Sequence, residues 1–245
     1  MSAESAELFA ACYCTLLDEL DWTLLGQLYC YEGGEHFFDE ERRAHILEVG
    51  LRSAAELGES LQRIDSGARA SLYVGASIAE LGPMLFETLV TGRTVDARNL
   101  PGPEADELNR ALAAAEERSG SRLPRIVTEP LVGRDRACDH IWFVSVLTDP
   151  EAFPALHDEL YERRGTPDAT GTGDLDDERR RAQELIEAAL DRAATPFLWT
   201  SSVDELGLVA GRCTARRMGL EALDGLWTSP IVGDDVRVHL STGDL

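Results

Sequence analysis

The chain has 245 residues, of which 44% are hydrophobic, and its 45 acidic residues outnumber 23 basic ones to give a formal net charge of −22. It contains no lysine, which excludes chemistry that needs a Schiff-base lysine or the lysine of a nucleotide-binding P-loop. The excess of acid repels a phosphate backbone, so we expect no nucleic-acid partner.

Membrane and metal signals are also missing. No apolar run approaches the ~18 residues of a membrane-spanning helix, and the N-terminal "MSAESAELFAAC" lacks the basic region of a secretion signal. We therefore expect no membrane association and a cytoplasmic location. The cysteines are odd in number and form no CxxC pair, which predicts reduced thiols and no metal site; they are Cys12, Cys14, Cys30, Cys138 and Cys213.

The first 65 residues have a helical pattern. Leucines predict a helix over residues 4–32, which the pair Gly33-Gly34 ends. Apolar residues at steps of three and four predict a second helix over about 39–63. We expect residues 1–65 to form a helical cap or lid on a second unit, residues 66–245.

The pattern then alternates between strand and helix. Strands are predicted at 71–75, 93–99, 124–130, 140–147 and 196–200, and helices at 78–92, 103–120 and 177–193. Two further helices are predicted from their caps: Asp149 with Pro150 begins one, and Ser202 with Glu205 forms a capping box for another that ends near Gly219. Residues 226–240 read as two strands joined at Gly233-Asp234.

This order predicts an α/β fold: a doubly wound, mainly parallel, Rossmann-like sheet with an antiparallel C-terminal strand pair and an N-terminal helical segment. Ligands of such sheets bind at the carboxyl ends of the strands. The loops that follow "SLYV", "TVDA", "IVTE" and "WFVSV" would all open there.

From about residue 65 onward the chain resembles the class I S-adenosylmethionine-dependent methyltransferases. Gly75 follows the first strand, Asp96 lies in the second, Glu129 follows the third, and "CDHIWFVSVLTDP" is similar to the fourth strand of that family. The closing strand pair and the helical N-terminal segment fit as well. The sequence departs from the family at its first glycine motif, where Tyr73 replaces an acid and where Ser77 and Ala79 replace two glycines.

The resemblance implies S-adenosylmethionine as cofactor. It implies that Asp96 would bind the ribose and that Glu129 would lie near the adenine. The full set of cofactor-binding candidates is Tyr73, Gly75, Ala76, Ser77, Asp96, Ala97, Glu129, Val144 and Ser145.

Two functions stay open. The first is a methyltransferase that acts on a small molecule, whose acceptor pocket the N-terminal helices would help to form. The second is a methyltransferase-like protein that does not catalyse and serves as a binding or scaffolding partner, for which a homodimer is one form. The replaced residues at positions 73, 77 and 79 favour the second, whereas the acid at Asp96 favours the first.

No catalytic group stands out from the sequence. Any of His36, His140 and His157 could act as a general base, because an imidazole titrates near neutral pH. The simpler interpretation is that His140 lies at the entry of its strand and that His157 faces solvent or packs at a helix edge. His36 follows the Gly33-Gly34 break, from which it could reach a pocket under the N-terminal helices.

Overall fold

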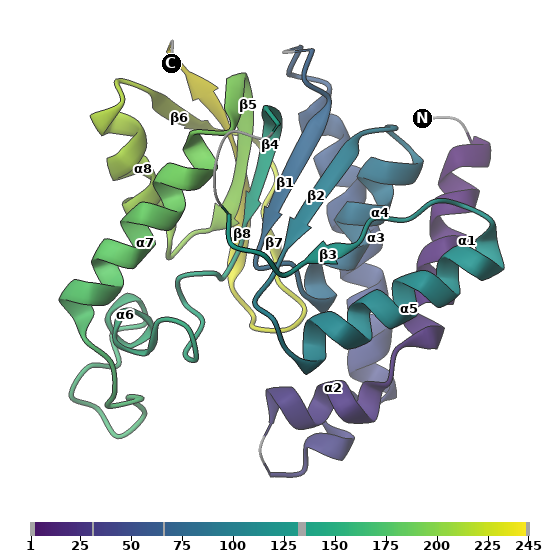
Figure 1. Cartoon of the computed structure of the whole chain (residues 1–245), viewed down its shortest axis with the longest axis horizontal. Helices are drawn as coiled ribbons and strands as arrows, with labels where there is room; N and C mark the ends of the chain where they lie inside the picture. Colours follow the sequence, from purple (N-terminus) through teal and green to yellow (C-terminus); the bar gives the residue numbers. More distant parts are fainter. Residues whose placement is uncertain (1–2, 31, 66, 132–135, 244–245) are drawn as a thin grey trace.

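The computed structural model describes residues 3–30, 32–65, 67–131 and 136–243 (Figure 1). One mixed sheet of eight strands lies between two layers of helices in this part of the chain. No helix among the described residues is long and apolar enough to cross a membrane.

The N-terminal segment begins with α1 (Ala3–Glu19) and α2 (Trp22–Tyr29), followed by the short η1 (Gly34–His36) and by α3 (Glu40–Leu61). The prediction of one helix over residues 4–32 was wrong, because the chain breaks at Leu20-Asp21. The Asp21 side chain accepts a hydrogen bond from the Leu24 backbone and so caps a new helix. The predicted second helix is confirmed as α3, which Asp39 caps in the same way.

The sheet confirms the predicted topology. Its order is β3-β2-β1-β4-β5-β8-β6, and β7 pairs with β8. Strands β1 to β5 are parallel, and β8 runs antiparallel to β5, β6 and β7. The bounds are β1 (Ala70–Val74), β2 (Thr94–Arg98), β3 (Ile126–Val127), β4 (Cys138–Phe143), β5 (Ala193–Ser202), β6 (Gly219–Ala222), β7 (Trp227–Thr228) and β8 (Asp235–Thr242).

Helices cover both faces of the sheet (Figure 1). The N-terminal helices lie on one side together with η2 (Ile78–Glu80), α4 (Leu81–Leu89) and α5 (Pro103–Ser119). The other side carries α6 (Pro154–Leu160), α7 (Leu175–Leu190) and α8 (Leu206–Ala215). Each helical layer packs against one face of the sheet and forms its own core. Alternate residues of β1 point into these cores: Tyr73 into the one under the N-terminal helices and Leu72 into the one under α6, α7 and α8.

The N-terminal helices share a core with the sheet. Phe9 of α1 meets Phe86 of α4 edge to face at 5.6 Å. Helices α3 and α4 cross so closely that a Cβ added to Gly82 would lie 2.9 Å from the Cα of Gly50. This contact fixes α3 against the helix that follows the first strand.

Three predicted details were wrong. Asp149 does not cap a helix: its carboxylate accepts hydrogen bonds from the backbone of Glu151 and Ala152, and α6 begins only at Pro154. The helix α8 ends at Ala215 instead of near Gly219, and the next residues form β6. Ser202 and Glu205 do meet, since the Ser202 hydroxyl donates to the Glu205 carboxylate at 2.6 Å, but Glu205 otherwise accepts from the loop after β4 and α8 begins without a side-chain cap bond, so the pair forms no capping box.

Candidate functional site

The carboxyl edge of the parallel strands is the place where this topology binds ligands. Strand order reverses between β1 and β4, which are neighbours in the sheet but not in the chain. Residues 75–77 follow β1 at this edge, residues 144–148 follow β4, and the loop 229–234 precedes the antiparallel β8. The candidate site is therefore built from these three segments and from the end of β2.

Gly75 makes the turn after β1. Its φ of +72° lies in the left-handed region that favours glycine, and a Cβ there would lie 3.0 Å from Val146 Cγ2. The next residue, Ala76, donates its N–H to the Arg98 carbonyl at the end of β2 at 2.8 Å. The turn is thus closely packed between the ends of β2 and β4.

Glu80 holds the next residue of the turn. Its carboxylate accepts hydrogen bonds from both the N–H and the hydroxyl of Ser77, at 2.9 and 2.8 Å. Its other oxygen accepts from the indole of Trp142 at 3.2 Å. Only 3% of Glu80 is exposed, and this burial raises the pKa of its carboxyl although the bonds from Ser77 and Trp142 lower it.

Tyr73 occupies the position where the resembled family has an acid. Its ring stacks on Trp142 at 5.3 Å, and its hydroxyl donates to Glu87 at 2.6 Å. Glu87 is fully buried and also accepts from Ser71 and Arg93. Tyr73 therefore lies inside the core under the turn.

The ribose candidate Asp96 is paired with two arginines. One carboxylate oxygen accepts from Arg98 Nε at 2.7 Å, and the other accepts from Arg192 at 2.6 Å. Burial alone would raise the pKa of Asp96, but these arginines lower it overall. Asp96 also lies two residues before the end of β2, on the face that carries Leu72.

Asn99 is the polar residue directly at the end of β2, and sequence reasoning missed it. Its amide donates to the Ala76 carbonyl at 2.9 Å and to the Glu104 carboxylate at 3.2 Å. Glu104 also accepts from the hydroxyl of Tyr29. The signal was available, since Asn99 is an uncharged polar residue at the last position of the predicted strand 93–99.

The remaining candidates lie near the same edge. Ala97 is fully buried in β2, and Val144, which follows β4, is buried as well. Glu129 is exposed on the loop after β3, and its carbonyl accepts from Arg98 at 3.3 Å. The structure therefore brings Gly75, Ala76, Ser77 and the end of β2 together.

Ser145 is the most constrained residue of the loop after β4. Its φ is +56°, a conformation that non-glycine residues adopt at a cost of about 1 kcal/mol or more. Its N–H donates to Glu205 at 2.9 Å, and its hydroxyl donates to Asp234 at 2.7 Å. Leu147 donates its N–H to Glu205 as well. Burial raises the pKa of Glu205 to about 7.

Asp234 joins three segments of this edge. It accepts hydrogen bonds from Ser145, from Thr148 at 3.5 Å and from the hydroxyl of Tyr161, just past α6, at 2.6 Å. Only 6% of Asp234 is exposed. The loop before β8, the loop after β4 and the end of α6 are thereby held together.

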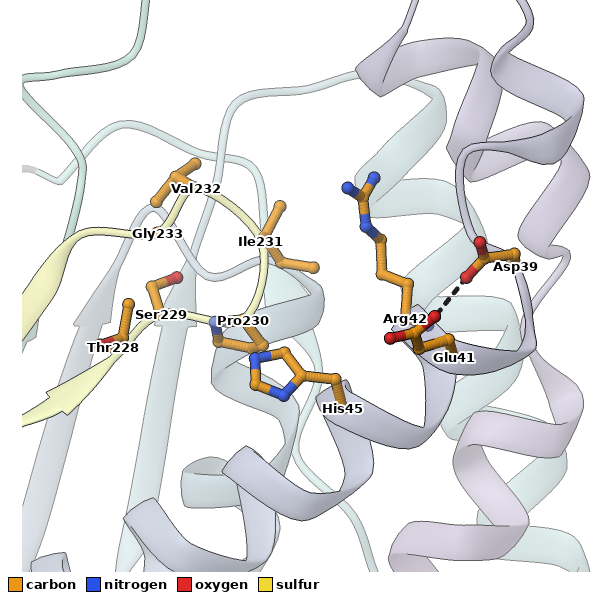
Figure 2. Close-up of a pocket in the computed structure, with 10 residues that line it drawn as sticks. All are labelled: Asp39, Glu41, Arg42, His45, Thr228, Ser229, Pro230, Ile231, Val232 and Gly233. Carbon is orange, nitrogen blue, oxygen red and sulfur yellow. Dashed lines mark hydrogen bonds between the residues drawn. The ribbon is translucent and has the colours of Figure 1, made fainter.

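A cavity of about 450 Å³ opens between the start of α3 and the loop before β8 (Figure 2). Arg42 and His45 extend from α3 on the side that faces this loop. The Arg42 guanidinium lies 4.0 Å from the centre of the Phe37 ring and donates to the Phe37 carbonyl. The lining residues are Asp39, Glu41, Arg42, His45, Thr228, Ser229, Pro230, Ile231, Val232 and Gly233.

The three candidate histidines lie elsewhere. His140 was expected at the entry of its strand, but it is fully buried within β4 and contacts Glu87 and Thr200. His157 is buried, with Nδ1 2.6 Å from the Thr148 carbonyl oxygen. His36 is exposed. None of the three lines the cavity.

Solved structures of similar fold were found, although no protein family model and no curated protein matches the sequence. The chain is similar to magnesium protoporphyrin IX methyltransferase from Synechocystis PCC 6803 with bound S-adenosylmethionine, at 9% identity and a TM-score of 0.51; the match covers 90% of this chain and 96% of that one. An O-methyltransferase from Bacillus cereus in complex with S-adenosylhomocysteine matches at 13% identity, with 90% and 98% coverage and a TM-score of 0.46.

The TM-score of 0.51 with the first structure shows a shared fold. The match to the first structure extends over nearly the whole of both chains, so it includes the helical segment as well as the sheet. The chain has the fold of the class I S-adenosylmethionine-dependent methyltransferases.

Proposed function

We propose that the chain is an S-adenosylmethionine-dependent methyltransferase that acts on a small molecule. The observation that carries this proposal is Gly75: a turn with φ of +72°, at the carboxyl end of β1, beside the point where strand order reverses. Backbone without a side chain at this place lets a ligand approach the strand ends closely.

The residues at this edge fit the cofactor. The backbone of Gly75, Ala76 and Ser77 would face its amino-acid end, and Val144 and Ser145 would lie on the β4 side. Asn99 is better placed for the ribose than Asp96, because Asn99 directly follows the carboxyl end of β2 whereas Asp96 lies two residues before that end. Ala97 and Tyr73 support the turn from inside, and Glu129 would lie toward the adenine. The bound cofactor supplies the methyl group.

The cavity between α3 and the loop before β8 would hold the acceptor. Its volume of about 450 Å³ lies within the range of small-molecule sites. Pro230, Ile231 and Val232 offer an apolar wall, and Arg42 and His45 offer hydrogen-bond donors. Methyl transfer is a direct displacement, so the correct position of the acceptor can supply much of the rate.

The charge of the chain supports a small molecule over a nucleic acid. A net charge of −22 opposes binding to a phosphate backbone. We further propose that the protein is cytoplasmic and that it forms a homodimer.

Calorimetric titration with S-adenosylmethionine and S-adenosylhomocysteine tests this function. We expect dissociation constants on the order of micromolar for both. Asn99→Ala should weaken binding by about tenfold, because a polar contact is lost. Asp96→Asn should change it less than about threefold, because Asp96 lies inside β2 and away from the carboxyl end of the strand.

One outcome would contradict the proposed function, and another would change only the residue assigned to the ribose. If a folded sample binds neither compound at about 1 mM ligand, S-adenosylmethionine is not a cofactor of this protein, since that concentration detects even weak complexes. The non-catalytic binding or scaffolding role would then be the function to pursue. Loss of binding in Asp96→Asn with full binding in Asn99→Ala would keep the function but move the ribose contact to Asp96.

A further inference from the structure

The first turn of α3 places one arginine on the wall of the cavity. Arg42 is half-buried, and its side chain extends on the side of α3 that faces the loop before β8 (Figure 2). Its guanidinium lies 4.0 Å from the centre of the Phe37 ring, and Nη1 donates to the Phe37 carbonyl at 3.1 Å. These two contacts hold the guanidinium in one orientation, which lowers the entropy that a ligand must remove on binding.

One edge of this guanidinium is left open. Within the parts of the chain that the structure describes, Nε and Nη2 of Arg42 donate no hydrogen bond, and no carboxylate forms an ion pair with them. Asp39 and Glu41 line the same cavity, but the Asp39 carboxylate accepts from the backbone N–H of Arg42 at 2.8 Å and so caps α3. Glu41 is the adjacent helical residue, and adjacent residues of a helix do not face each other.

The opposite wall adds a second polar group without a partner. Ser229 lines the cavity and only 6% of it is exposed, yet its hydroxyl forms no hydrogen bond with the described residues. Its backbone N–H is already used, since it donates to the Asp234 carbonyl at 2.8 Å. Pro230 and Ile231 continue this wall with apolar surface. The cavity therefore has a charged donor on one side and a hydroxyl beside an apolar strip on the other.

Direct contact with Arg42 favours an anion here although the chain is acidic. Asp39 and Glu41 are both exposed, so water and salt screen their charges from a ligand in the cavity. The open edge of Arg42 offers two parallel N–H groups, and a carboxylate that accepts both makes one of the strongest contacts available to a side chain. The local geometry therefore outweighs the long-range repulsion.

We propose that the acceptor of this site is a small carboxylic acid. Its carboxylate accepts two hydrogen bonds from Nε and Nη2 of Arg42, its apolar body lies against Pro230 and Ile231, and a polar group at its other end meets the Ser229 hydroxyl. That end faces the strand ends, because Ser229 is bonded to Asp234 and Asp234 to the loop after β4. This inference rests on the proposed function, since it names the class of acceptor.

The test uses pairs of probes that differ in charge but little in shape. They are benzoate with benzamide, 2-naphthoate with 2-naphthamide, and indole-3-acetate with indole-3-acetamide. Ligand-observed NMR titration at about pH 7, where only the acids are charged, measures their affinities with and without saturating S-adenosylhomocysteine. We expect at least one carboxylate to bind about tenfold more tightly than its amide, as a charge-assisted bidentate pair predicts.

Variants of α3 locate the preference. Arg42→Gln should lower the affinity for the carboxylate by about tenfold and change that for the amide less than about twofold. Arg42→Lys keeps the charge but not the two parallel donors, so its loss should be intermediate. Arg43→Gln is the matched control, because Arg43 also donates to a backbone carbonyl, that of Phe38, and lies over the ring of Trp22, but does not line the cavity. It should change neither affinity.

The Ser229 contact has its own comparison. 6-Hydroxy-2-naphthoate should bind more tightly than 2-naphthoate, and Ser229→Ala should remove this difference while the preference for a carboxylate stays.

Three results would overturn the inference. They are a panel in which no carboxylate binds more tightly than its amide, a preference that persists in Arg42→Gln, and equal losses in Arg42→Gln and Arg43→Gln. Failure of the proposed function is a different result, because wild-type protein would then bind neither S-adenosylmethionine nor S-adenosylhomocysteine, whatever the probes do.

Discussion

The Glu87 carboxylate lies 2.8 Å from Nδ1 of His140, and both side chains are fully buried. They join α4 to β4 beneath the glycine turn, and Arg93 and Tyr73 complete the cluster. Burial alone would raise the pKa of Glu87, but His140, Arg93 and Ser71 together lower it to about 2. The turn is therefore supported by a buried ionic network and not by apolar packing alone.

Glu87→Gln should destabilise the protein by ~3–5 kcal/mol, because it leaves Arg93 buried with one partner fewer. Glu187→Gln is the matched control, since Glu187 also contacts arginines but is partly exposed; it should cost about 1 kcal/mol or less. Urea unfolding of both variants measures the difference. Similar losses of unfolding free energy in the two variants would show that burial of the Glu87 network adds no stability.

The free energy of unfolding should depend on pH through the same residue. The folded-state pKa of Glu87, about 2, lies below its unfolded value of 4.5. Its contribution is thus fully present above pH 4.5 and is lost as the pH falls toward 2. In Glu87→Gln the loss over this window should be smaller than in the wild type. Equal losses would contradict the pKa direction.

Glu205 should act in the opposite direction and in another window. Its folded-state pKa of about 7 exceeds the unfolded value of 4.5 because of burial. The stability that it contributes is fully present below pH 4.5 and is lost as the pH rises through 7. The difference in unfolding free energy between wild type and Glu205→Gln should therefore change across this interval. A constant difference would mean that Glu205 does not titrate there.

Gly75→Ala should destabilise the protein by about 1–3 kcal/mol, because φ is +72° and the new Cβ would meet Val146. Gly92→Ala separates the two causes: its φ is +65°, but nothing lies within 4 Å of the added Cβ. The excess cost at Gly75 should disappear when Val146→Ala is added. Equal thermal shifts for Gly75→Ala and Gly92→Ala would show that contact with Val146 is unimportant.

Asp234→Asn should lower stability by about 1–2 kcal/mol, because the amide has one accepting oxygen for three hydroxyl donors. Asp235→Asn is the neighbouring control: Asp235 is exposed and accepts one bond from Thr228. Limited proteolysis of the exposed residues 162–168 after Tyr161 gives a second readout, and cleavage should be faster in Asp234→Asn only. Equal cleavage rates would contradict the role of Asp234 in holding these segments.

The sequence predicts the fold well because its signals are local. Apolar runs and amphipathic stripes alternate from residue 71 onward, and the right-handed crossover rule then fixes most of the strand order. The break at Leu20-Asp21 was missed because the leucine stripe continues across it. Strand β6 was missed because its residues are mostly exposed and show no alternation.

The candidate site was predictable only in part. Gly75 is recognisable because a glycine ends an apolar run. Asp96 was chosen by position, and its arginine partners come from β2 and from a residue 96 positions away. Glu80 is marked by the local Ser77-x-x-Glu80 pattern of a capping box, and Asn99 by its place at the end of a predicted strand. Asp234 owes its place to contacts with residues far away in the sequence, so no local pattern marks it.

A crystal structure of the protein with S-adenosylhomocysteine tests the central claim most directly. We expect the compound to lie at the carboxyl ends of β1 and β4, against the backbone of Gly75 and Ala76, with its ribose near Asn99. A compound bound away from the glycine turn, or none bound in crystals soaked at a concentration that saturates the calorimetric titration, would contradict it.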